Sequence, residues 1–196
     1  MTPVFIHYFL KIFFIFTPFF VVSVFASLTK DLGDGEKNRI ANKVTIAVMV
    51  SSFVIFLAGE TIFQLFSITL DAFRIGAGAV LFLSALSMIN GRADVSANHG
   101  QDIAVVPLAM PITVGPGVIG VLMVIGAELD TPQERVSVAL ALFCAVLAVG
   151  LLLRLSNRAR FLNRPHTQVI LTKVTGLFVS AIAAQIFFTG VKNFMA

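Results

Sequence analysis

The stretch Val106-Pro107-Leu108-Ala109-Met110-Pro111-Ile112-Thr113-Val114-Gly115-Pro116-Gly117-Val118-Ile119 decides the fold of this chain. It places three prolines and two glycines inside an apolar run that is long enough to cross a bilayer. Proline removes a backbone donor and clashes with the preceding turn, and glycine is a poor helix former. In lipid, such a break survives only where protein or a water-filled cavity satisfies the freed backbone groups. The stretch therefore predicts a helix broken at membrane depth, as in many transporters; the alternative is a kinked helix packed for shape.

The composition indicates an integral membrane protein. Hydrophobic residues make up 58% of the chain and charged residues only 12%, whereas a soluble domain carries about 25% charged residues. Six apolar stretches are each long enough to span the hydrocarbon core, and little chain remains for any other domain. We expect a single all-α membrane domain over residues 1–196, with spans at roughly 4–28, 44–66, 69–90, 103–127, 136–154 and 167–191.

The first apolar stretch has some features of a cleaved signal peptide. Lys11 could close a basic region, and Val24 and Ala26 fit the small-residue rule before a cleavage site. However, Lys11 lies well inside the chain for such a region. We therefore expect this stretch to be retained as the first span.

The distribution of basic residues predicts the orientation. By the positive-inside rule, the side with more Lys and Arg in short loops faces the cytoplasm. One side carries nine basic residues, namely Lys30, Lys37, Arg39, Lys43, Arg92, Arg154, Arg158, Arg160 and Arg164. The other side carries Arg135 and Lys192, with Arg74 as a third candidate. Both termini should therefore lie on the non-cytoplasmic side. The net charge of +4 follows from this loop bias, and we expect no nucleic-acid partner.

The two halves of the chain resemble each other. Pro18 and Pro116 are 98 residues apart, and the basic residues Arg74 and Lys173 are 99 apart. Because each half contains an odd number of spans, the second copy must cross the membrane in the opposite direction. The sequence thus predicts an inverted repeat, with copies at about 1–92 and 102–196, as in many secondary transporters.

The string VPLAMPITVGPGVI resembles the signature of the MarC family of six-span bacterial membrane proteins. The similarity extends through Ser27–Lys30, Leu70–Gly78 and Gln185–Phe194, and so covers essentially the whole chain. The resemblance implies a multi-pass protein of the bacterial cytoplasmic (inner) membrane that moves small neutral amino acids.

The first span departs from the family pattern. The family usually has Asn-Pro, a glycine and a second proline there, whereas this chain has Thr17-Pro18-Phe19-Phe20-Val21-Val22-Ser23. The first proline is present, but the glycine and the second proline are absent. We expect the bulky Phe20 to make the first break stiffer and narrower, and this bears on both the inherited substrate and transport itself.

Charged residues within the spans are candidates for function because they are costly in lipid. Glu60 and Arg74 each lie seven residues from the expected turn near Ser67, so a salt bridge between them is predicted. It could line a substrate path or act as a structural pin. Glu60 is also the candidate site for proton coupling. Lys173 either reaches the headgroups or faces a cavity, where it could meet a substrate carboxylate.

The breaks suggest how a zwitterion could be held. Amides that follow Gly115-Pro116-Gly117 form a half-helix N-terminus, which attracts a carboxylate. Carbonyls released before the prolines could hold an ammonium group or a cation. The substrate-binding candidates are Thr17, Pro18, Pro111, Thr113, Gly115, Pro116, Gly117 and Gln185.

Enzymatic chemistry finds little support in the sequence. The three histidines are scattered and the single Cys144 has no partner, so we predict no metal site, no catalytic residue and no cofactor. No phosphate-binding loop is present, so transport would be driven by an ion gradient, of protons or sodium, or by the substrate gradient. The expected function is secondary transport of small neutral amino acids or similar solutes. The alternatives are a non-transporting scaffold or regulatory protein and a passive channel. The bilayer is the one firm partner, and a homo-oligomer is possible.

Overall fold

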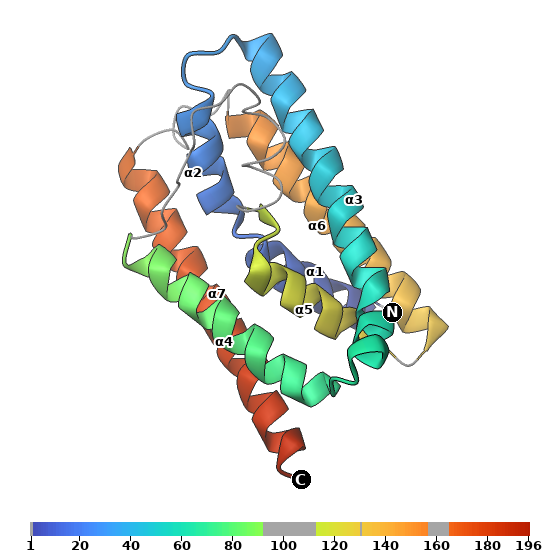
Figure 1. Cartoon of the computed structure of the whole chain (residues 1–196). Helices are drawn as coiled ribbons and strands as arrows, with labels where there is room; N and C mark the ends of the chain where they lie inside the picture. Colours follow the sequence, from blue (N-terminus) through green and yellow to red (C-terminus); the bar gives the residue numbers. More distant parts are fainter. Residues whose placement is uncertain (1, 92–112, 130, 157–164) are drawn as a thin grey trace.

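The computed structural model describes residues 2–91, 113–129, 131–156 and 165–196. These residues form helices only, without strands (Figure 1). The helices are α1 (Thr2–Ile15), α2 (Pro18–Leu28), α3 (Asp34–Phe66), α4 (Leu70–Ile89), α5 (Pro116–Ala127), α6 (Pro132–Ser156) and α7 (Pro165–Phe194).

Five apolar helical runs are long enough to cross a membrane: Pro3–Leu28, which joins α1 and α2, and the helices α3, α4, α6 and α7. The fifth helix in chain order, α5, is apolar but shorter. Five of the six expected spans are therefore confirmed as helices. The fourth span is described only in its second half, because residues 103–112 lie outside the described part of the chain.

The α3 helix begins ten residues before the apolar run predicted at 44–66. Lys37, Arg39 and Lys43, which we expected in or at the edge of a loop, lie in its first turns. Asp34 and Glu36 in the first turn favour this start, because acidic side chains offset the positive end of the helix dipole. With this polar extension α3 has 33 residues, more than the about 20 that are needed to cross the hydrocarbon core.

The first span is broken where the sequence predicted it. Thr17 separates α1 from α2 and has φ 48° and ψ 55°, in the left-handed region. Its amide donates to the Phe14 carbonyl at 2.9 Å, which tightens the end of α1. Pro18 then opens α2, a position where its missing N–H costs nothing.

The α5 helix forms the centre of the molecule, crossing between α3 and α4 (Figure 1). Eight of its twelve residues are buried. It approaches α3 closely at Gly126, because glycine has no side chain. A Cβ there would lie only 2.0 Å from the Phe56 carbonyl oxygen. Toward α4, a Cβ on Gly120 would lie 2.6 Å from Ala77 Cβ. Small residues let helix backbones approach in this way in membrane proteins.

The α4 and α7 helices run side by side (Figure 1). A Cβ on Gly78 of α4 would lie 3.0 Å from the Ala183 carbonyl oxygen of α7. A Cβ on Gly176 of α7 would lie 3.2 Å from the Ala85 carbonyl oxygen of α4. Each helix therefore presents a glycine to the main chain of the other.

Candidate functional site

Two half-helices start inside the molecule, α2 at Pro18 and α5 at Pro116. Thr17 and Pro18 are buried at the first start, and Thr113 is 0% exposed just before the second. Gly115 precedes α5 in an extended conformation, with φ −73° and ψ 172°. The predicted break at Thr17-Pro18 is confirmed. At Gly115-Pro116 the described residues show the start of α5, and residues 92–112 before it lie outside them. Pro111, a further candidate, lies outside the described residues.

The first amides of α5 have no partner within their own helix. The intrahelical ladder begins with the Ile119 amide, which donates to the Gly115 carbonyl at 2.9 Å. The amides of Gly117 and Val118 precede it, and a helix start of this kind carries a partial positive charge. Gly117 is buried against α4, and a Cβ there would lie 2.9 Å from Leu81 Cα. Pro116 itself is exposed.

The surroundings of both breaks are apolar. Phe16 and Val21 flank the first break and Val114 and Val118 flank the second, and all four belong to one cluster of buried hydrophobic residues. In such a low-dielectric region, backbone dipoles act on a charge more strongly than they do in water. A carboxylate at either half-helix start would therefore be bound mainly by main-chain amides.

Gln185 does not join the breaks. It lies on an exposed face of α7, and its Nε2 donates to Thr189 Oγ1 at 3.3 Å, one turn along the same helix. The prediction that places Gln185 among the substrate-binding residues finds no geometric support, because the helix turns this side chain outward.

Lys173 also lies on an exposed face of α7. Among the described residues, it takes part in none of the salt bridges. This position fits the alternative in which the ammonium group reaches the headgroups, and not the one in which it faces a cavity.

The predicted salt bridge between Glu60 and Arg74 is wrong. Arg74 pairs instead with Asp71, one turn before it, and with Glu128 at the end of α5, where Nη2 lies 2.8 Å from Oε1. Glu60 pairs with Arg135 of α6 at 3.1 Å. Spacing from the turn does not give the direction in which each helix face points.

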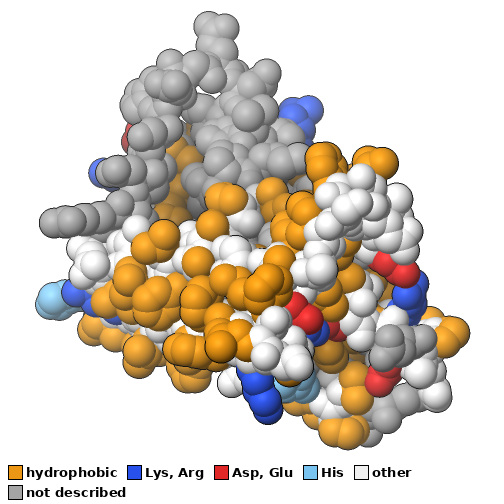
Figure 2. Space-filling model, turned by 60° about the horizontal axis from the view of Figure 1, so that its bottom comes forward, with side chains coloured by type: hydrophobic (Ala, Val, Ile, Leu, Met, Phe, Trp, Pro, Cys, Tyr) orange, Lys and Arg blue, Asp and Glu red, His pale blue; other side chains and the backbone are white. Residues whose placement is uncertain are grey.

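The Arg74 contacts tie three helices together at one end of the molecule. Arg74 of α4 holds Glu128 by Nε and Nη2, and Asn193 Nδ2 of α7 donates to Asp71 at 3.3 Å. The side chains of Arg74 and Glu128 are only 13% and 23% exposed. Figure 2 looks toward this end of the molecule, where hydrophobic side chains cover much of the surface and charges appear in small groups of both signs.

The model of the MarC family, described as MarC family integral membrane proteins, matches residues 2–195. The chain belongs to the MarC family. It is also 34% identical to a UPF0056 membrane protein of Methanocaldococcus jannaschii, over 96% of both chains. It is 30% identical to the UPF0056 membrane protein YhcE of Escherichia coli K12, over 97% of this chain and 93% of that one. No solved structure matches it.

These comparisons establish a multi-pass integral membrane protein of the MarC family, as the sequence motifs predicted. The relatives are named only as membrane proteins, so their names assign no substrate. Within the described ranges of this MarC family protein, no group of three or more His, Cys, Asp or Glu side chains could hold a metal ion.

Two residues of this MarC family protein carry features that we did not predict. Glu128 follows directly after the expected span at 103–127, and its pair with Arg74 is more enclosed than the pair of Glu60 with Arg135. Ser52 of α3 is 0% exposed, and its hydroxyl has no hydrogen-bond partner among the described residues. The burial of Ser52 could have been predicted from the sequence, since it lies four residues from both Val48 and Phe56 on one face of the helix.

Proposed function

We propose that this protein is a secondary transporter of small neutral amino acids or similar zwitterionic solutes across the bacterial cytoplasmic membrane. The observation that carries the proposal is the pair of half-helices, α2 and α5, that start at Pro18 and Pro116 inside a buried core. Half-helix ends at the midplane are where secondary transporters bind charged groups of their substrates.

The substrate site lies where the two half-helices start. The amides that begin α2 and α5 receive the substrate carboxylate, because each start bears a partial positive charge. Thr17 and Thr113 bring hydroxyl groups to the two breaks. Carbonyls at the end of α1, which the left-handed Thr17 takes out of the helix, receive the ammonium group.

The two halves form an inverted repeat, and the packing of α4 on α7 supports this. Gly78 and Gly176 are 98 residues apart, and so are the residues that each contacts on the opposite helix, Ala85 and Ala183. This is also the spacing of Pro18 and Pro116. The contact between α4 and α7 thus follows a spacing of 98 residues, and not the spacing of 99 that separates Arg74 from Lys173.

The ion pairs break this symmetry. A shift of 98 residues from Glu128 and Arg74 leads to Lys30 and Thr172, which cannot form a salt bridge. With both termini on the non-cytoplasmic side, the Arg74–Glu128 pair closes the outer end, and Lys30 and Thr172 do not form its counterpart at the other end. The outer gate is held by charge, and a proton or sodium ion that reaches Glu128 or Glu60 would loosen it.

The test is uptake and counterflow of labelled alanine, glycine and serine in proteoliposomes, with and without proton or sodium gradients. Thr17→Val removes a hydroxyl at the break, and Thr29→Val removes one that is equally buried at the end of α2. We expect saturable flux that falls about tenfold or more in Thr17→Val, because small misplacements at a binding site are costly. Thr29→Val should keep its flux.

Gly117→Ala and Gly76→Ala form a second matched pair. The first would push α5 against Leu81, whereas a Cβ on Gly76 meets nothing within 4 Å. Gly117→Ala should lose flux, and Gly76→Ala should keep it. Accumulation against a gradient would exclude the passive channel and the scaffold. The absence of flux from folded protein under every gradient would contradict the proposal and favour the scaffold.

A further inference from the structure

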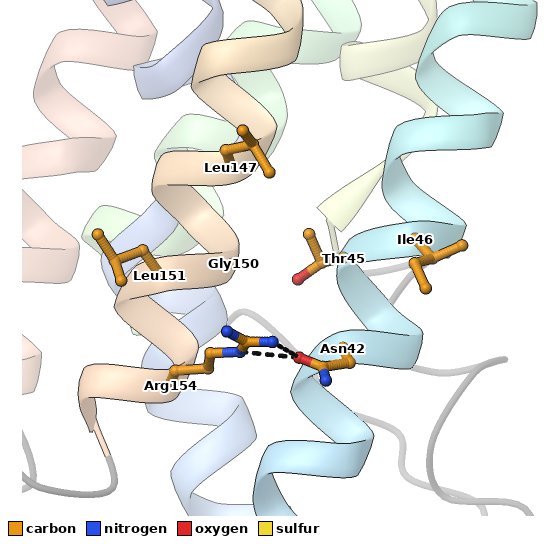
Figure 3. A pocket seen from close by; sticks show the side chains of 7 residues that line it. All are labelled: Asn42, Thr45, Ile46, Leu147, Gly150, Leu151 and Arg154. Atoms are coloured by element: carbon orange, nitrogen blue, oxygen red, sulfur yellow. Dashed lines mark hydrogen bonds between the residues drawn. The ribbon is translucent and has the colours of Figure 1, made fainter.

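A groove of about 480 Å³ lies between α3 and α6, away from the helix breaks. Its lining combines apolar side chains with two polar ones at one end (Figure 3). The lining residues are Asn42, Thr45 and Ile46 of α3, and Leu147, Gly150, Leu151 and Arg154 of α6.

The walls of the groove suit a hydrocarbon chain. Ile46, Leu147 and Leu151 are all exposed, on the outer side of the helix pair. Thr45 adds little polarity, because its hydroxyl donates to the Ala41 carbonyl of its own helix at 2.7 Å. At the floor, Gly150 lets the two helices meet, since a Cβ there would lie 2.4 Å from Thr45 Oγ1.

At the polar end of the groove, Arg154 has no carboxylate partner among the described residues. Arg154 donates to Asn42 Oδ1 from Nε, at 2.8 Å, and from Nη2 (Figure 3). Among the described residues, Arg74 and Arg135 form salt bridges and Arg154 does not. Two of its five N–H donors are used, so three remain, and the Asn42 carboxamide nitrogen adds two more. These donors lie at one end of the groove, where they can bind an anion.

The depth of this end matches the headgroup layer. Arg154 lies in the last turn of α6, and Asn42 lies just before the apolar part of α3 that begins at Val44. The α6 helix has 25 residues and is about 37 Å long at about 1.5 Å per residue. It is therefore longer than a hydrocarbon core of about 30 Å. The same end carries Lys43, on the side with the excess of basic residues.

We propose that the groove between α3 and α6 binds an anionic phospholipid, with an acyl chain along Ile46, Leu147 and Leu151 and the phosphate on Arg154 and Asn42. Arginine presents a planar set of donors that matches phosphate oxygens. Basic pockets between transmembrane helices on the cytoplasmic side are known to bind such headgroups. The apolar wall, together with a cation that has no carboxylate partner among the described residues, favours a lipid over a small anion.

Binding is measured by native mass spectrometry of the purified full chain with phosphatidylglycerol, and with phosphatidylcholine of the same acyl chains as the neutral lipid. We expect Arg154→Gln to weaken phosphatidylglycerol binding about tenfold, as for loss of one charge-assisted contact. Lys43→Gln removes the same charge beside Asn42 but outside the groove lining, and should change binding less than about twofold. Arg154→Lys should restore part of the binding.

A second variant tests the groove without touching the charge. Leu151→Ala shortens the apolar wall and should weaken the affinity for the lipid several-fold, while its thermal unfolding in detergent stays near that of the parent. This keeps the proposal testable if Arg154→Gln fails to fold. The proposal is overturned if Lys43→Gln and Arg154→Gln lose equal affinity, if phosphatidylcholine binds as tightly, or if inorganic phosphate displaces the lipid.

Discussion

Gly78 and Gly176 occupy reciprocal positions in the contact between α4 and α7, and each touches the main chain of the helix that carries the other. Neither position has room for a side chain without movement, because the nearest backbone atom would lie 2.8 Å from a Cβ on Gly78 and 3.2 Å from one on Gly176. In lipid, where burial of apolar surface does not drive helices together, such close packing is a main source of association. The two glycines therefore set the close approach of α4 and α7.

The first prediction concerns these glycines. Gly78→Ala and Gly176→Ala should each destabilise the protein by about 1–3 kcal/mol, the usual cost of overpacking. Thermal unfolding in detergent measures this. Gly76→Ala, in the same helix but with open space around it, should be neutral or stabilising by up to about 1 kcal/mol. An equal loss in Gly76→Ala would show that the close contact between α4 and α7 does not set the effect, because Gly76 has no neighbour within 4 Å.

The second prediction compares two ion pairs. Arg74–Glu128 is largely enclosed, so a double-mutant cycle with Arg74→Gln and Glu128→Gln should give a coupling of about 1–3 kcal/mol. Glu60–Arg135 is 51% exposed on both sides, and the same cycle should give about 0.2–1 kcal/mol. Unfolding in detergent at low and high salt reports both values. If the exposed pair gave the larger coupling, the enclosed pair would not be the one that holds this end together.

The third prediction concerns the left-handed residue at the first break. Thr17 is branched at Cβ and has φ 48°, a combination that costs about 1–2 kcal/mol, whereas asparagine adopts this conformation more readily. Thr17→Asn should therefore unfold at the same temperature as the parent or higher. The same backbone would suit the asparagine that the MarC family usually places before this proline.

Thr29→Asn is the matched control for this change. Thr29 is equally buried, but it has φ −103° and its hydroxyl donates to the Phe25 carbonyl at 2.7 Å. No strain is relieved there, so asparagine should cost about 1–2 kcal/mol in the unfolding assay. Similar losses at both positions would mean that the left-handed conformation of Thr17 carries no strain.

The fourth prediction tests the orientation. Cys144 is the only cysteine in the sequence, so Cys144→Ser gives a background for single introduced cysteines. In whole cells, a membrane-impermeant maleimide should label Lys192→Cys and leave Lys37→Cys unlabelled until the membrane is opened. The reverse pattern would place both termini in the cytoplasm and would exchange the inner and outer ends described above.

The features that sequence predicted well are local. Hydropathy found five of the spans, and proline found the break at Thr17-Pro18 and the start of α5 at Pro116, because each depends on a few neighbouring residues. The start of α3 at Asp34 was missed because its first turns are polar and have no apolar period. The partners of Glu60 and Arg74 were missed because helix rotation is set by packing between distant segments, and Arg74 and Glu128 are 54 residues apart. The exposed position of Gln185 on α7 has the same cause.

Ser52 gives the folded protein a local deficit in hydrogen bonding. Its hydroxyl is buried without a partner among the described residues, which costs about 1–3 kcal/mol relative to a satisfied group. Ser52→Ala should accordingly raise the unfolding temperature in detergent, and an unchanged or lower temperature would show that the hydroxyl is not a burden. The Ser52 hydroxyl therefore lowers the thermal stability of the protein. A molecule that donates a hydrogen bond to it on binding would gain the corresponding free energy as affinity.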